Sequence, residues 1–114
     1  MEKLEKYRHL VQEFLLEYSK NKPAYGEIEV QPIFDTVRDH YQIVYMGWKN
    51  DYLIHSCPIH IDIKGEKNWL QWNGTEVDIA EELVMNGVAK KDIVLGFHTP
   101  FMRKFTEYAT LLII

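Results

Sequence analysis

Cysteine is nearly absent from this sequence. Among 114 residues only Cys57 carries a thiol, so no disulfide can form within the chain, as is usual in a reducing cytoplasm. The charged residues 1–6 contain no apolar core of a signal peptide, and the apolar residues 111–114 are far too few to cross a bilayer. We therefore expect a cytoplasmic protein without a membrane segment.

Positive charge is also scarce. Thirteen Lys and Arg residues face seventeen Asp and Glu residues, which gives a formal net charge of −4 at pH 7. Bulk electrostatic attraction to nucleic acid is therefore not expected, although the net charge does not exclude a local basic patch. The 46% of hydrophobic residues supports a folded core, and the 26% of charged residues argues against a membrane protein. The length predicts one domain that spans residues 1–114.

Motifs of several catalytic and cofactor-binding classes are missing. The six glycines are scattered singly, so no phosphate-binding loop is present, and no serine lies in a Gly-x-Ser-x-Gly elbow. No His-x3-His pair marks a helix. His55 and His60 are five residues apart in one predicted strand, so their rings face opposite sides unless a bulge intervenes. We expect neither a cofactor nor a bound metal.

The first half of the chain changes from a helical period to a strand period. Apolar residues recur every three or four positions over residues 2–20, which predicts an amphipathic helix. Alternation then begins at residue 27, and Pro32 within this first run indicates an edge strand or a bulge. Short turns separate the further strands predicted over residues 41–48, 52–64 and 68–72. Four strands joined by such turns predict an antiparallel meander.

The second half predicts helices and one short strand. Thr75 and Asp78 resemble a capping box, so we expect a helix over residues 76–86 that ends at Gly87. Residues 93–95 form a brief extended segment, and Pro100 opens a last short helix that runs to about residue 108. The predicted fold class is α+β: helix, four-stranded meander, helix, short strand and short C-terminal helix.

One strand carries a run of polar side chains that resembles a catalytic motif. His60, Asp62 and Lys64 alternate with isoleucines and should project from one side of the predicted strand. An Asp-x-Lys pair is typical of metal-dependent nucleases, where the carboxylate holds a cation and the lysine helps to activate water. Such a site needs a second acid, for which the candidates are Asp35, Asp39 and Asp51. The hydrated face of a half-buried strand gives the same pattern, and we favour that interpretation.

Tryptophans and the chain end offer candidate interfaces. Exposed tryptophan often marks a protein interface because it buries much area at little entropic cost. Trp48 and Trp69 are therefore candidate interface anchors. Leu112 and Ile114 belong to an apolar tail that offers a self-complementary patch, so we expect a homodimer. Basic pairs could also gather into a nucleic-acid patch: Lys20/Lys22, Lys64/Lys67, Lys90/Lys91 and Arg103/Lys104.

Short motifs along nearly the whole chain resemble those of one protein family. In the first half they are YGEIEV at residues 25–30, DHYQ at 39–42 and GW at 47–48. In the second half they are HIDIK at 60–64, WLQ at 69–71, GTE at 74–76, IAEEL at 79–83 and KDIVLGFH at 91–98. In this order they resemble the XisI proteins, the fdxN-element excision controlling factors of cyanobacteria. Ala89, where the family often has proline, and Tyr108, where it often has phenylalanine, are small departures.

The resemblance implies a small cytoplasmic α+β protein that helps to control excision of a DNA element during heterocyst differentiation, alongside a separate recombinase. It also implies pairing with XisH, an endonuclease-like protein, and it carries over no catalytic residue. We therefore favour a non-enzymatic accessory factor that binds protein, because an acidic chain suits a basic partner better than bare DNA. A direct DNA-binding factor and an enzyme centred on Asp62 and Lys64 are the alternatives.

Overall fold

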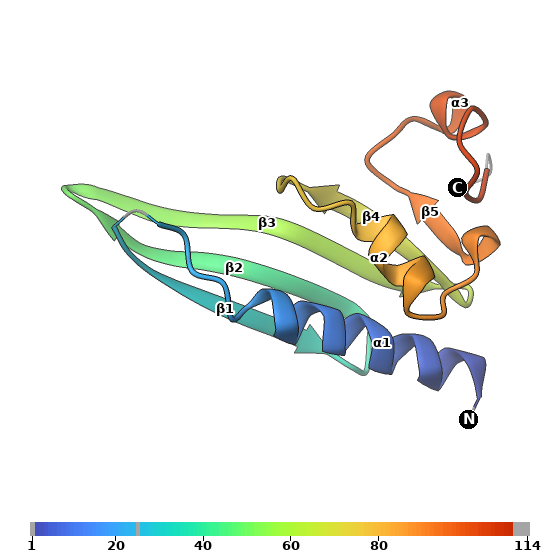
Figure 1. Cartoon of the computed structure of the whole chain (residues 1–114), viewed down its shortest axis with the longest axis horizontal. Coiled ribbons are helices and arrows are strands. Elements are labelled where there is room, and N and C mark those ends of the chain that lie inside the picture. The colour runs from blue at the N-terminus through green and yellow to red at the C-terminus, as the bar shows by residue number, and fades with distance from the viewer. Residues whose placement is uncertain (1, 25, 111–114) are drawn as a thin grey trace.

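A computed structural model describes residues 2–24 and 26–110 of the chain. A single five-stranded sheet, in the order β1-β2-β3-β4-β5, forms its centre (Figure 1). The elements are α1 (Lys3–Tyr18), β1 (Glu27–Asp35), β2 (His40–Lys49), β3 (Tyr52–Lys64), β4 (Lys67–Asn73), α2 (Ile79–Met85), a 3-10 turn (Lys90–Asp92), β5 (Ile93–Leu95) and α3 (Pro100–Arg103).

The antiparallel meander is confirmed, and the predicted short strand completes the sheet. β1 to β4 pair antiparallel in sequence order, whereas β5 pairs parallel to β4 after the α2 crossover. β1 is an edge strand, as Pro32 indicated. Gly65 and Glu66 form the predicted tight turn into β4, and both have a φ near 60°, as a type I′ turn requires.

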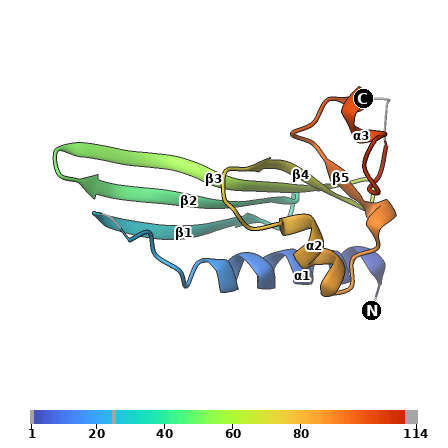
Figure 2. The same ribbon diagram turned by 45° about the horizontal axis from the view of Figure 1, so that its top comes forward.

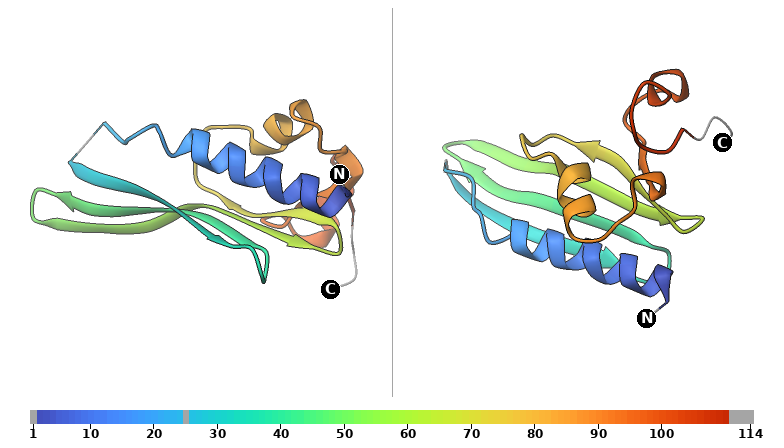
Figure 3. Two further views of the ribbon diagram at one scale, coloured as in Figure 1. Left: turned by 90° about the horizontal axis from the view of Figure 1, so that it is seen from below. Right: turned by 45° about the vertical axis from the view of Figure 1, so that its right-hand side comes forward.

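The two longer helices, α1 and α2, cover one face of the sheet. α1 and α2 lie side by side on this face, and the opposite face of β1 to β3 carries no helix in the described part of the chain (Figures 2 and 3). The far end of the β2–β3 hairpin extends beyond both helices (Figure 1). None of the helices formed by residues 2–24 and 26–110 has the length and apolarity that crossing a bilayer requires.

Burial alternates along the strands as the sequence predicted. Ile59, Ile61 and Ile63 of β3 are buried against the helices, and Tyr41 and Ile43 of β2 join them in the core. The stripe of α1 that packs on this surface is also fully or almost fully buried: Tyr7, Val11 and Leu15. Full burial of one such side chain contributes about 1.5–3 kcal/mol, so this interface orients the helices on the sheet.

A bulge in β3 changes which residues share a face. Ile43 pairs with Ile59, but Tyr45 pairs with Ser56, so β3 contains one residue more than β2 over this stretch. His55 and His60 therefore lie on the same face of the sheet. In a regular strand Leu53 would share the face of Ile59, Ile61 and Ile63, because side chains alternate with a period of two. The bulge moves it to the opposite face, where it pairs with Trp48.

Two helix boundaries also differ from the sequence prediction. α2 begins at Ile79 rather than residue 76, because Asp78 is its N-cap and accepts a hydrogen bond from the Glu81 amide at 3.1 Å. The Thr75 hydroxyl instead accepts from the Val77 amide at 3.2 Å within the preceding turn. α3 ends at Arg103 rather than near residue 108. The chain then turns back, and the Ala109 amide donates to the Ile93 carbonyl of β5 at 2.8 Å.

Two buried carboxylates fasten α1 to the rest of the fold. Asp39 accepts from Nε of Arg8 at 2.8 Å and from the Tyr41 hydroxyl at 2.7 Å. Asp92 accepts from the Tyr7 hydroxyl at 2.6 Å and pairs with the Lys3 ammonium at 2.8 Å. Each carboxylate therefore links the first helix to a segment far away in the sequence.

These carboxylates make stability depend on pH in the acid range. Hydrogen bonds from Arg8 lower the pKa of Asp39. Burial alone would raise the pKa of Asp92, but bonds from Lys3 and Tyr7 outweigh burial and lower it. Because the folded pKa values lie below the unfolded value of about 3.9, the unfolded state takes up protons first as the pH falls. The stabilisation is complete above the unfolded pKa and disappears as the pH falls through the folded values.

We expect the urea midpoint of the chain to be lower at pH 3 than at pH 5. The D92N variant removes one of the responsible groups, so its midpoint should fall less over the same interval. Circular dichroism during urea titration measures both midpoints. A wild-type midpoint that stays constant between the two pH values would contradict this assignment.

Candidate functional site

The side of the sheet opposite α1 and α2 gathers most of the candidate functional residues. Cross-strand pairs share a face, so the register assigns alternate positions of β1 to β4 to this side, opposite the core. We call it the open face. It includes Glu27, Glu29, Ile33, Asp35, His40, Gln42, Met46, Trp48, Leu53, His55, His60, Asp62, Lys64, Trp69 and Trp72.

Three of these residues form a compact cluster, which we call the histidine–aspartate cluster. His60 and Asp62 are two positions apart in β3, and His40 of β2 lies directly opposite Asp62. Nδ1 of His40 is 2.7 Å from Oδ1 of Asp62, and Nε2 of His60 is 2.8 Å from the same oxygen. Two imidazoles therefore converge on one carboxylate oxygen.

Two glutamines hold the cluster in place. Nε2 of Gln71 donates to the second oxygen of Asp62 at 3.1 Å, and the amide nitrogen of Gln42 is 3.4 Å from Nδ1 of His60. Burial of Asp62 would raise its pKa, but the hydrogen bonds from His40, Gln71 and His60 outweigh burial and lower it. Asp62 is therefore an ionised, buried carboxylate at neutral pH, while the His40 side chain is half exposed.

The structure brings Asp62 together with His60, and not with the other residues of the proposed nuclease motif. The Lys64 ammonium lies 4.2 Å from the centre of the Trp69 ring. Asp35 lines the same shallow hollow as His40 and His60, but its Oδ1 already accepts two backbone amides of the β1–β2 turn. Asp39 is held by Arg8, and Asp51 lies in the turn at the far end of the hairpin.

The far end of the open face is apolar at its centre and acidic at its edge. Trp48 and Leu53 form a direct cross-strand pair, and their exposed fractions are 56% and 52%. Glu27 of β1 lies opposite Trp48, and Glu29 lies opposite Met46. We call these five residues the hairpin patch. They give this end of the sheet the composition of a protein interface, with an aromatic centre and a charged rim.

The other candidate anchors have different settings. Trp69 is partly buried, and the Arg103 guanidinium lies 5.3 Å from its ring on the side of α3. Leu112 and Ile114 lie outside the described residues. Sequence reasoning did not single out a group of exposed side chains around α3, namely Phe97, Phe101, Met102 and Phe105.

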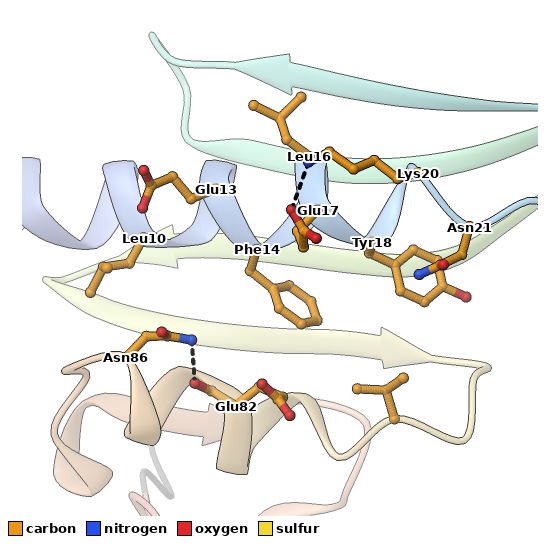
Figure 4. A pocket seen from close by; sticks show the side chains of 11 residues that line it. Leu10, Glu13, Phe14, Leu16, Glu17, Tyr18, Lys20, Asn21, Glu82 and Asn86 are labelled. Carbon is orange, nitrogen blue, oxygen red and sulfur yellow. Dashed lines mark hydrogen bonds and ion pairs between the residues drawn. The ribbon is translucent and has the colours of Figure 1, made fainter.

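A second hollow lies between α1 and α2 on the helical side of the molecule. Figure 4 shows Phe14 pointing from α1 toward α2, with Leu10 beside it. Glu13 and Glu17, which are exposed, also line this hollow. Its volume is about 560 Å³. Glu17 is paired with Lys20 at 2.9 Å. This groove offers an apolar floor and carboxylates, and none of the histidine–aspartate cluster lines it.

Sequence reasoning missed His40 as the partner of Asp62. A hairpin closed at Asn50 and Asp51 without a bulge would pair His40 with Ile61, so the strand pattern alone gives the wrong neighbour. Pro58 next to the register change was the available signal, because proline in a strand interior favours a bulge.

Comparison with solved structures places this fold among close relatives. The chain is 45% identical to a XisI-like protein from Anabaena variabilis ATCC 29413, with a TM-score of 0.88 over 95% of this chain and 99% of the other. It is 30% identical to the fdxN element excision controlling factor XisI from the same organism, with a TM-score of 0.83 over 96% and 100%. No curated protein matches the sequence. The family described as XisI protein matches residues 1–110, and the chain belongs to this family.

Proposed function

We propose that this chain is an accessory factor that controls excision of a DNA element and that acts by binding another protein. Family membership supports the controlling role. One solved relative, which the match covers over 100% of its length, is an fdxN element excision controlling factor. The setting implied by the resemblance is DNA rearrangement during heterocyst differentiation. The partner implied in the same way is an endonuclease-like XisH protein.

The observation that carries the protein-binding mechanism is the exposed pair of Trp48 and Leu53 on the sheet face opposite α1 and α2, where no described helix lies over β1 to β3. Large apolar side chains at the centre of an interface supply most of its binding energy. The flanking Glu27 and Glu29 are exposed and favour a partner surface that carries lysine or arginine around an apolar pocket. The net charge of −4 also favours a basic partner, because it attracts positively charged surfaces as the two proteins diffuse together.

The settings of the basic residues support a protein partner over bare DNA. Lys3 and Lys67 both pair with Asp92, and Lys90 pairs with Glu107 at 2.9 Å. Lys20 and Lys22 lie at the end of α1, in a different part of the molecule. Acidic partners within the chain therefore offset the positive charge of these three paired lysines, which DNA phosphates would otherwise attract.

Co-expression with the XisH protein of the same host tests the proposal. We expect the two chains to elute together from size exclusion at micromolar concentration, and we expect the chain alone to give no mobility shift with DNA at low salt. Separate elution of two folded proteins would contradict the proposal. A salt-sensitive shift by the chain alone would favour the DNA-binding alternative instead.

A further inference from the structure

We propose that the histidine–aspartate cluster of the open face binds a divalent transition-metal ion, and that Zn²⁺ is the ion it binds best. The donor atoms would be Nδ1 of His40, Nε2 of His60 and Oδ1 of Asp62. Each of the three residues has a donor atom that lies within 4.8 Å of the donor atoms of the other two. They come from two paired strands, so the sheet fixes their spacing before an ion arrives.

The chemistry of the donors selects the class of ion. Two imidazole nitrogens and one carboxylate oxygen suit Zn²⁺ and its neighbours in the first transition row. Mg²⁺ and Ca²⁺ prefer sites made of oxygen atoms, so this cluster disfavours them. The site therefore differs from the magnesium-dependent nuclease arrangement that an Asp-x-Lys motif suggests.

An ion can enter after a small movement of the side chains, because the N–O distances of 2.7 and 2.8 Å must widen by about 0.5 Å to surround a tetrahedral Zn²⁺ ion. It would replace the protons that His40 and His60 now share with Asp62, and each ring would carry its proton on the other nitrogen. For His40 that nitrogen belongs to a half-exposed ring, where water can accept the proton. For His60 it faces the Gln42 amide, which can rotate to offer its oxygen in place of its nitrogen.

Gln71 would orient the Asp62 carboxylate without touching the ion. It donates to the second oxygen of Asp62 at 3.1 Å and so leaves the first oxygen directed at both rings. Such outer contacts orient the ligands of metal sites and commonly change metal affinity 10–100-fold. Three protein donors leave a fourth position for water or a partner group. The inference does not depend on the proposed partner, because the site lies within one chain.

Titration of the purified full chain, prepared without a histidine tag, tests this site. Co²⁺ is the spectroscopic probe, because it gives intense visible absorption in tetrahedral sites with nitrogen and oxygen donors. We expect one equivalent of Co²⁺ to bind and one equivalent of Zn²⁺ to displace it. The H40Q and H60Q variants should bind at least about tenfold more weakly, and Q71A should also bind more weakly.

The H55Q variant is the matched control. His55 lies on the same face and in the same strand as His60, but outside the cluster, so its replacement should leave Co²⁺ binding unchanged. His40 has a half-exposed side chain, so H40Q should fold, and circular dichroism verifies this. Failure of the wild-type chain to take up stoichiometric Co²⁺ or Zn²⁺ at micromolar free ion would overturn the inference. Undiminished binding by folded H40Q would do the same.

Discussion

The D92N variant should unfold with a free energy lower by about 2–4 kcal/mol than the wild-type chain. Asp92 is 2% exposed, and its carboxylate accepts the Tyr7 hydroxyl at 2.6 Å and the Lys3 ammonium at 2.8 Å. An amide cannot compensate the Lys3 and Lys67 charges, and it leaves Tyr7 with a weaker acceptor. The loss is moderated because Lys3 is half exposed and can regain water.

Urea denaturation at pH 7 measures this difference, with D51N as the control. Asp51 lies exposed in the β2–β3 turn, so its replacement should change the unfolding free energy by no more than about 0.5 kcal/mol. Equal stabilities of D92N and wild type would show that the buried carboxylate does not fasten α1 to the sheet.

The second large effect concerns binding. The W48A variant should bind the XisH partner about 2 kcal/mol more weakly than the wild-type chain, or roughly 30-fold. Trp48 is 56% exposed, so its truncation removes little of the core and should leave the fold intact. Isothermal titration calorimetry measures the affinity, and circular dichroism verifies the fold.

Tyr52 supplies a matched control for the face that binds. It lies in the same hairpin with an exposed fraction of 74%, but it pairs with Lys49 and so projects from the other side of the sheet. We expect Y52A to bind the partner as the wild-type chain does. If Y52A and W48A weaken binding equally, the hairpin patch is not the specific docking surface.

Local patterns in the sequence predicted most of the fold. The stripe of α1 and the alternation of β3 each repeat over several turns or pairs, so single exceptions do not hide them. Pro32 identified the edge strand because only there is a missing amide donor tolerated. The start of α2 was misplaced because Thr75 and Asp78 both match capping residues, and hydrogen-bond geometry decides between them.

The candidate site was harder to predict because it depends on register. The neighbours of Asp62 are set by one extra residue in β3, and His40 becomes its partner only through that shift. His60 was recognised because it shares a strand with Asp62. The contact of Arg103 with Trp69 depends on how α3 returns to the sheet, which no local periodicity encodes.

Hydrogen exchange of the chain, with and without its XisH partner, tests docking through the open face most directly. We predict that complex formation slows amide exchange in residues 46–56, which include the end of the β2–β3 hairpin, and in the edge strand β1. Exchange in α1 and α2 should stay unchanged. Protection confined to the α1–α2 groove, or no change in exchange at any segment at saturating partner, would contradict the account.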